Sequence, residues 1–218
     1  ADIRFIDQTP TLQYYYNYLN HKAYEPALTL KFYEIIKQNP SFNFIDLGAH
    51  YGYFSLLAAK WINKPNSVFS VEPHPLFFDH LQHNVKVNKL DEIINSYQIA
   101  LSDKPGKATM TGKDERIFNE KPDGSIPGLT FDTLCEEENI LPDIIKMDVH
   151  GAEGKILDGM PDALKKVSHI FIETHSDMMG YSVDKLVELL QNARLSVYEF
   201  TKHRDIDGGA IVEVSKDV

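Results

Sequence analysis

The chain has 218 residues, 43% of them apolar and 25% charged, which is typical of one globular domain with a full core. Its formal net charge of −10 and the absence of a long basic run argue against a surface that binds nucleic-acid phosphates. The single cysteine, Cys135, excludes an internal disulfide and favours a reducing, cytoplasmic compartment, and no apolar run approaches the roughly 18 residues of a membrane span.

The first forty residues have helical character. Residues 11–38 contain four tyrosines between positions 14 and 18, followed by an apolar segment that Pro40 terminates. The tyrosines suit either an acceptor-binding lid or an amphipathic helix docked on a sheet. We therefore expect residues 1–40 to form a helical segment that packs on or caps the core, and residues 41–218 to form the main domain.

Residues 43–52 predict a strand followed by a glycine turn, and the residues after them predict a helix. Gly48 and Gly52 bracket the turn, where glycine allows the backbone to approach a ligand closely. The spacing departs from the dinucleotide fingerprint G-x-G-x-x-G, and Asp46 precedes the first glycine by two residues. Because a carboxylate repels phosphate but attracts an ammonium group, this turn favours a cofactor that carries an amino acid, such as S-adenosylmethionine.

A second acid, Glu72, ends the next predicted strand, where it could bind both ribose hydroxyls of an adenosine. A helix is expected over residues 75–90, a third strand over residues 93–100 and a short added strand over residues 108–111. Residues 111–128 are rich in Gly, Lys, Asp, Glu and Pro, which predicts an exposed loop.

The remaining segments continue an alternation of strands and helices. Strands are expected at 143–148, 167–173, 196–201 and 210–214, with helices around Cys135 and at 156–164 and 185–193. This pattern predicts a parallel or mostly parallel sheet with helices on both faces. Asp46, Glu72, Asp148 and Glu173 all lie at predicted strand ends, the edge at which ligands bind in such sheets.

Five segments between residues 42 and 176 resemble those of the FkbM family of S-adenosylmethionine-dependent methyltransferases. They are FIDLGAHYG from Phe44, VEPHP from Val71, ALSD from Ala100, KMDVHGAE from Lys146 and IETH from Ile172. The first two occur in many methyltransferases, and the last two are specific to the family, which usually has glutamate where this chain has His150. The resemblance implies a class I, Rossmann-like α/β fold with a seven-stranded, mostly parallel sheet whose last strand inserts antiparallel.

The motifs and the resemblance together assign roles to individual residues. Cofactor binding is expected of Asp46, Gly48, Ala49, His50, Gly52, Glu72, Pro73, Ala100, Leu101 and Asp148. Catalytic roles are expected of Asp148, His150, Glu153 and His175, with an imidazole as general base if the acceptor is a hydroxyl. An alternative is a divalent metal ion held by Asp148, His150, Glu173 and His175.

The expected function is S-adenosylmethionine-dependent O-methylation of a hydroxyl or carboxyl group. The resemblance implies a sugar or another natural product as acceptor, and we expect a small-molecule, sugar or peptide partner; the net charge argues against nucleic acid. Two alternatives remain open at this point: an oxidoreductase that binds a nicotinamide cofactor on the same sheet, and a binding module without turnover. The sequence identifies neither the acceptor nor the oligomeric state.

Overall fold

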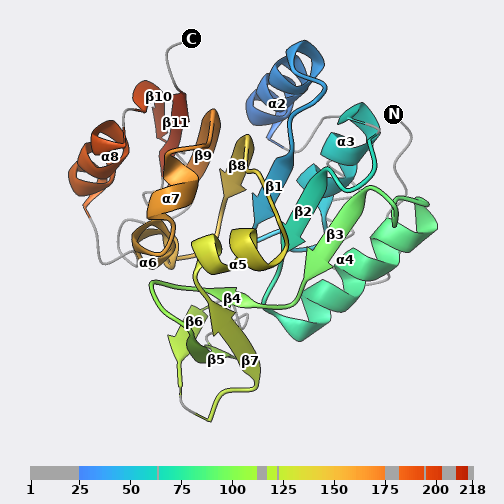
Figure 1. Ribbon diagram of the computed structural model, residues 1–218, viewed down its shortest axis with the longest axis vertical. Helices are drawn as coiled ribbons and strands as arrows, with labels where there is room; N and C mark the ends of the chain where they lie inside the picture. Colours follow the sequence, from blue (N-terminus) through green and yellow to red (C-terminus); the bar gives the residue numbers. More distant parts are fainter. Residues whose placement is uncertain are drawn as a thin grey trace.

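The computed structural model describes residues 25–62, 64–111, 117–121, 123–174, 182–193, 195–202 and 210–215 (Figure 1). The tyrosines at positions 14–18 and the candidate base His175 lie outside these residues. None of the helices in the described segments is long and apolar enough to cross a membrane.

The main sheet has seven strands in the order β10-β11-β9-β8-β1-β2-β3. Their bounds are Phe44–Leu47 (β1), Val68–Val71 (β2), Ile94–Tyr97 (β3), Ile144–Met147 (β8), His169–Thr174 (β9), Ser196–Lys202 (β10) and Ala210–Ser215 (β11). The strands from β9 to β3 are parallel, whereas β11 is antiparallel to both of its neighbours. This topology confirms the expected mostly parallel sheet with an inserted antiparallel strand.

Helices cover both faces of this sheet, which explains why its central strands are buried throughout and mostly apolar (Figure 1). The helices are α2 (Pro26–Gln38), α3 (Tyr53–Ile62), α4 (Pro75–Val87), α5 (Phe131–Glu137), α6 (Glu153–Asp158), α7 (Pro161–Leu164) and α8 (Val183–Asn192). Phe44 and Val68 share one core with α2, α3 and α4, while Ile45 and Phe69 share the other with α5 to α8. Alternate residues of each strand therefore supply the two cores.

Three polar residues interrupt the apolar strands in a single row. Asp46 of β1 is paired in register with Ser70 of β2 and with Lys146 of β8, so all three side chains face α3. All three are buried. A buried polar row of this kind needs internal partners, because burying a charge without one is costly.

A second sheet of four strands lies next to the carboxyl ends of the first (Figure 1). Its order is β4-β7-β5-β6, with bounds Ala100–Leu101 (β4), Gly106–Thr111 (β5), Ile117–Glu120 (β6) and Ile126–Leu129 (β7). The predicted short strand at 108–111 is confirmed as part of β5. The expectation of an exposed loop over residues 111–128 is wrong where β6 and β7 form. Gly124, between β6 and β7, allows the chain to pass close to β5, since a Cβ there would lie 2.3 Å from the carbonyl oxygen of Ala108.

The helix α2 packs directly on the main core through one aromatic side chain. The Phe32 ring makes edge contacts with Phe44, Phe54 and Phe171, at centroid distances of 5.2, 5.4 and 4.6 Å. The rest of the expected N-terminal segment, residues 1–24, lies outside the described part of the chain.

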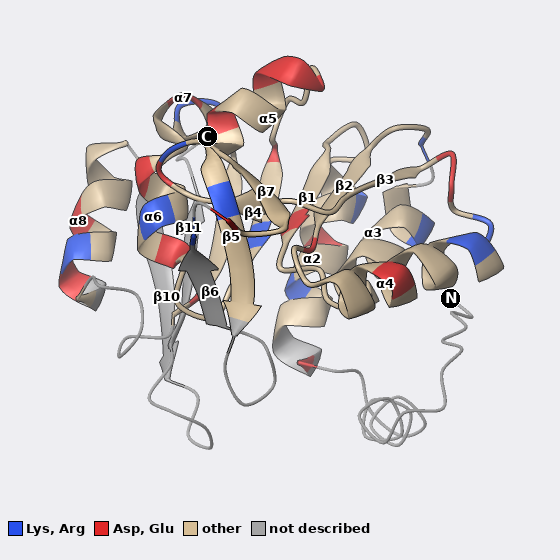
Figure 2. Ribbon diagram, turned by 90° about the horizontal axis from the view of Figure 1, so that it is seen from below, with Lys and Arg blue, Asp and Glu red and all other residues tan. Residues whose placement is uncertain are grey.

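Basic and acidic residues are interspersed on the outer surfaces of α4, α6 and α8 (Figure 2). In the described segments they do not separate into one basic and one acidic face. This distribution offers no continuous basic stripe for a phosphate backbone on these helices.

Candidate functional site

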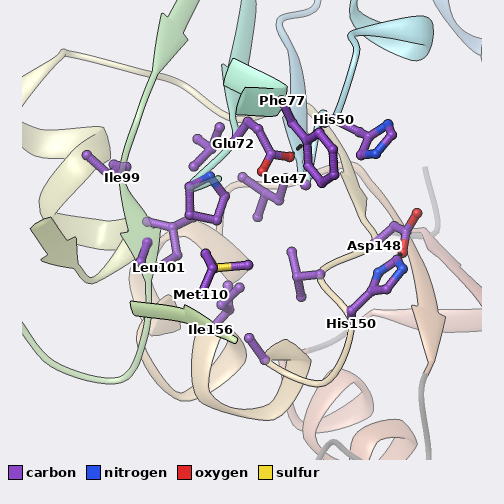
Figure 3. Close-up of a pocket in the computed structure, with 16 residues that line it drawn as sticks. Leu47, His50, Glu72, Phe77, Ile99, Leu101, Met110, Asp148, His150 and Ile156 are labelled. Atoms are coloured by element: carbon purple, nitrogen blue, oxygen red, sulfur yellow. Dashed lines mark hydrogen bonds and ion pairs between the residues drawn. The ribbon is translucent and has the colours of Figure 1, made fainter. Parts of the chain in front are cut away.

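A pocket opens where β1, β2 and β8 end, beside the small sheet (Figure 3). Eight of the residues expected from the sequence line it: Gly48, His50, Glu72, Pro73, Ala100, Leu101, Asp148 and His150. The structure thus brings together residues that are as much as 102 positions apart in the chain. This is the edge at which parallel α/β sheets bind ligands.

Glu72 is the buried acid of this pocket. Its Oε2 accepts a hydrogen bond from the His50 N–H at 2.8 Å, and its Oε1 accepts one from the His74 N–H at 2.9 Å. Burial raises the pKa of this carboxyl to about 7, although the two N–H groups and Lys146 oppose the rise. A carboxylate has about four acceptor sites. With two hydrogen bonds from backbone N–H groups, Glu72 therefore still has acceptor sites for the hydroxyls of a diol.

The turn after β1 touches the turn after β8. Gly48 has φ of +78°, and a Cβ at this position would lie 1.8 Å from the carbonyl oxygen of Asp148. Only glycine allows this approach, which joins two walls of the pocket. His50 and His150 also have left-handed backbones, with φ of 52° and 53°, and both imidazole-bearing turns face the pocket.

Ala49 and Gly52, two further residues expected to bind the cofactor, are not part of the pocket wall. Gly52 has φ of +85°, and a Cβ there would lie 2.5 Å from Leu81 of α4. Ala49 is buried in the core that α2, α3 and α4 share. These residues shape the turn rather than line the pocket.

Asp46 does not line the pocket either. It is 1% exposed, and its Oδ2 accepts hydrogen bonds from the N–H and the hydroxyl of Ser55, at 3.1 and 2.6 Å. Its Oδ1 lies 3.7 Å from Nζ of Lys146. Burial raises the pKa of Asp46, while Lys146 and Ser55 oppose the rise. The carboxylate thus caps the N-terminus of α3 and connects to the pocket through Lys146.

Asp148 and His150 lie within ion-pair distance of each other on the pocket wall (Figure 3). Nδ1 of His150 lies 3.1 Å from Oδ1 of Asp148, whose Oδ2 lies 3.3 Å from Nζ of Lys146. The His150 side chain is 34% exposed, whereas those of Asp148 and Lys146 are 16% and 7% exposed. The His150 imidazole is therefore partly open to solvent, and the more buried Asp148 and Lys146 fix its orientation.

The other two acids expected at the site, Glu153 and Glu173, do not line the pocket. Glu153 is 0% exposed at the start of α6, and its Oε1 accepts a hydrogen bond from the Gly151 N–H at 3.2 Å. Glu173 lies on β9, two strands from β1. No group of three His, Cys, Asp or Glu side chains in the described segments is arranged to hold a metal ion. His175, the remaining candidate for base or metal ligand, lies outside those segments.

Apolar residues that the sequence did not indicate complete the walls. They are Phe77, Ile99, Met110, Val149, Ala152 and Ile156, together with Leu47 and Val71 of the strands. The Phe77 ring lies 4.2 Å from the ring of His50 and 4.3 Å from that of His74, between centroids. An apolar slot beside a buried carboxylate suits an adenosine, whose ring is flat and whose ribose carries a diol. The residues present therefore fit S-adenosylmethionine.

Comparisons with known proteins agree with this geometry. Residues 46–198 match the sequence profile of the methyltransferase FkbM domain. Over 169 residues the chain is 29% identical to the hexuronic acid methyltransferase AglP of Haloferax volcanii, covering 74% of this chain and 66% of that protein.

Two solved structures show the same fold. An FkbM methyltransferase from Methylobacillus flagellatus has a TM-score of 0.61 at 16% identity, covering 80% of this chain and 44% of the other. An O-methyltransferase from Bacillus cereus, in complex with SAH, has a TM-score of 0.54 at 16% identity, covering 94% and 88%. The chain spans less than two thirds of the length of AglP and of the Methylobacillus protein. The chain belongs to the methyltransferase FkbM domain family, a family of S-adenosylmethionine-dependent methyltransferases with the class I fold.

Proposed function

We propose that this chain transfers a methyl group from S-adenosylmethionine to an oxygen atom of a sugar acid. The observation that carries the proposal is the pocket around Glu72 at the strand ends of an FkbM domain. The choice of acceptor is supported by the similarity to AglP, which is a hexuronic acid methyltransferase.

The residues that would hold the cofactor divide into a polar and an apolar set. Glu72 would accept hydrogen bonds from the ribose hydroxyls, while Ile99, Leu101 and Met110 would contact the adenine ring. When bound, the cofactor supplies an electrophilic methyl group on a sulfonium ion. Asp46 would act indirectly, by capping α3 and by pairing with Lys146.

The pair formed by Asp148 and His150 would serve a hydroxyl acceptor. Because Asp148 engages Nδ1, Nε2 is the nitrogen that would take the acceptor's proton. Glu153 would act through the turn, since it accepts a hydrogen bond from Gly151 next to His150. A carboxylate acceptor has no proton to lose, so transfer to it would not depend on the imidazole.

Binding of S-adenosylhomocysteine tests the cofactor site. Isothermal titration should give a saturable heat with the unmutated chain and an affinity at least about tenfold weaker with Glu72→Gln, the loss expected when one charge-assisted hydrogen bond is removed. Glu136→Gln, which makes the same change on the exposed surface of α5, should leave the affinity unchanged. Absence of heat in the unmutated chain would contradict the cofactor assignment.

Methyl transfer to matched sugars tests the acceptor. With isotope-labelled S-adenosylmethionine, we expect label on glucuronic or galacturonic acid and much less on glucose or galactose. Base treatment distinguishes the products, because a methyl ester is hydrolysed and a methyl ether is not. His150→Asn should reduce ether formation by about 10²-fold or more and leave ester formation nearly unchanged. Transfer to neither class of sugar would contradict the acceptor assignment, and cofactor binding without any transfer would favour the binding-module alternative.

A further inference from the structure

Lys146 is a buried lysine in the central strand pair of the main sheet. It is the third residue of β8 and is paired in register with Asp46 of β1 and with Phe171 of β9. It is 6% exposed and does not line the pocket. A lysine in this place must gain enough from its partners to offset the loss of hydration.

The ammonium group of Lys146 lies among three oxygen atoms and one ring. Its Nζ is 3.3 Å from Oδ2 of Asp148, 3.5 Å from the carbonyl oxygen of Gly48 and 3.7 Å from Oδ1 of Asp46. It also lies 5.4 Å from the centre of the Phe54 ring on α3. The ammonium donates hydrogen bonds to Asp148 and Gly48, and its contact with Asp46 is an ion pair.

Two of the three oxygens belong to the pocket wall, because Gly48 and Asp148 both line it. The third, from Asp46, belongs to the carboxylate that caps α3. Lys146 therefore connects the turn after β1, the turn after β8 and the start of α3 at a single atom. Gly48 and Asp148 already touch through their backbones, so the ammonium lies directly behind their contact.

Four carboxylates from separate parts of the chain act on the charge of Lys146. Burial lowers the pKa of Lys146, but the charges of Asp148, Asp46, Glu25 and Glu173 outweigh it and the net pKa is raised. The lysine therefore stays protonated and cannot serve as a base. Its function at this site is that of a fixed positive charge.

We propose that Lys146 is a positioning residue of the active site, which holds the β1 and β8 turns together and directs Asp148 toward His150. The proposal rests on the proposed function, in which His150 takes a proton. One oxygen of Asp148 faces the lysine and the other faces the imidazole, so the lysine sets both the orientation of the carboxylate and how much of its charge acts on His150.

The pKa of His150 measures this arrangement without requiring cofactor or turnover. In Lys146→Met, a positive charge is removed and Asp148 faces only His150, so the imidazolium is favoured. We expect the pKa of His150, followed by NMR titration of the protein, to rise by about one unit. Lys146→Arg keeps the charge and should leave the pKa close to its original value. The His150 resonance is identified by its absence in His150→Asn.

Activity gives a second readout. If a hydroxyl sugar is methylated, the acidic limb of the pH–rate profile should move to higher pH in Lys146→Met, in parallel with the NMR titration. The matched control is Lys60→Met, which removes the same charge from an exposed position on α3 and should change neither quantity. An unchanged His150 pKa in folded Lys146→Met would overturn the proposal.

If Lys146→Met does not fold, the same NMR titration of Asp46→Asn tests the proposal. This change removes one of the anions that share the ammonium, so Lys146 interacts more strongly with Asp148 and the pKa of His150 should fall. No shift in that variant would equally overturn the proposal. Failure of the proposed function itself would appear separately, as absence of S-adenosylhomocysteine binding to the unmutated chain.

Discussion

The carboxyl group of Glu72 combines burial with two backbone hydrogen bonds. It is 5% exposed, and burial raises its pKa from 4.5 to about 7 against the opposing effect of the N–H groups of His74 and His50. Between these two pH values the folded chain binds a proton that the unfolded chain has lost. The stability contribution of Glu72 is therefore greatest below about pH 4.5 and declines as the pH rises to about 7.

This linkage predicts that the unfolding free energies of the unmutated chain and of Glu72→Gln depend differently on pH. The unmutated chain should lose up to roughly 3 kcal/mol of unfolding free energy across this window through Glu72, and the variant should not lose this contribution. Urea titrations at pH 5 and pH 8 measure the difference for each protein. Glu136→Gln, with its exposed side chain, should follow the unmutated chain. Equal pH dependence of Glu72→Gln and the unmutated chain would contradict the raised pKa.

Asp46 and Glu72 look equivalent in the sequence, since each ends an apolar segment before a turn. The structure separates them by their position relative to the strand end. Asp46 is the third residue of β1, so the alternation of side chains directs it to the face covered by α3. Glu72 follows the last residue of β2 and lines the pocket. A shift of the strand boundary by one or two residues therefore decides whether an acid is buried under a helix or lines the pocket. Sequence patterns do not predict strand boundaries to that precision.

At the scale of secondary-structure elements, the contact between the β1 and β8 turns depends on one glycine. Gly48→Ala would place a methyl group on a backbone with φ of +78° and 1.8 Å from a carbonyl oxygen that cannot move independently. We expect a loss of more than about 2 kcal/mol in unfolding free energy, together with weaker S-adenosylhomocysteine binding. Thermal denaturation and titration measure the two effects.

Gly106→Ala is the matched control for this change. Gly106 begins β5, has no heavy atom within 4 Å of an added Cβ, and does not have a positive φ. The substitution should change stability by no more than about 1 kcal/mol. Similar losses in both variants would show that the close approach at Gly48 does not matter.

The alternation of apolar segments with helical periods predicted the central strands and their helices. The strands were predictable because β1, β2 and β8 are buried on both faces and are therefore mostly apolar. Of the small sheet the sequence predicted only the segment at residues 108–111, which is part of β5. Strands β6 and β7 have four residues each, and each pairs with β5, where Gly106 lies opposite Gly128 of β7.

The helix at residues 75–90 was predicted, and its apolar positions Leu81 and Val85 are buried, but the orientation of its first turn could not be predicted. In that turn Leu76 is 52% exposed, whereas Phe78 is buried and Phe77 lines the pocket. Three consecutive apolar residues at a helix start fit more than one orientation. Only the packing of the neighbouring turns selects among them.

At the scale of the whole molecule, α2 is held to the sheet by Phe32, which is 1% exposed and contacts the rings of Phe44, Phe54 and Phe171. Phe32→Ala should reduce the unfolding free energy by about 3–5 kcal/mol, because the cavity would lie among three elements that cannot all move inward. Urea denaturation followed by circular dichroism should show one transition at lower urea concentration. A separate early transition would mean that α2 unfolds independently of the sheet.

Leu30→Ala provides the comparison on the same helix. Leu30 is 56% exposed, so its removal should change stability by no more than about 0.5 kcal/mol. A large loss in this variant would indicate that the exposed side of α2 is covered by another part of the chain or by a partner.

The inserted strand β11 has a consequence for synthesis. It follows both β9 and β10 in the sequence yet lies between them, and β10 pairs with no other strand in the described segments. On the ribosome, β10 must therefore emerge with its hydrogen-bonding groups unpaired and remain so until residues 210–215 have been made. This half of the sheet can be completed only after β11 has been made, and until then β10 presents an unpaired edge that favours aggregation or binding of a chaperone.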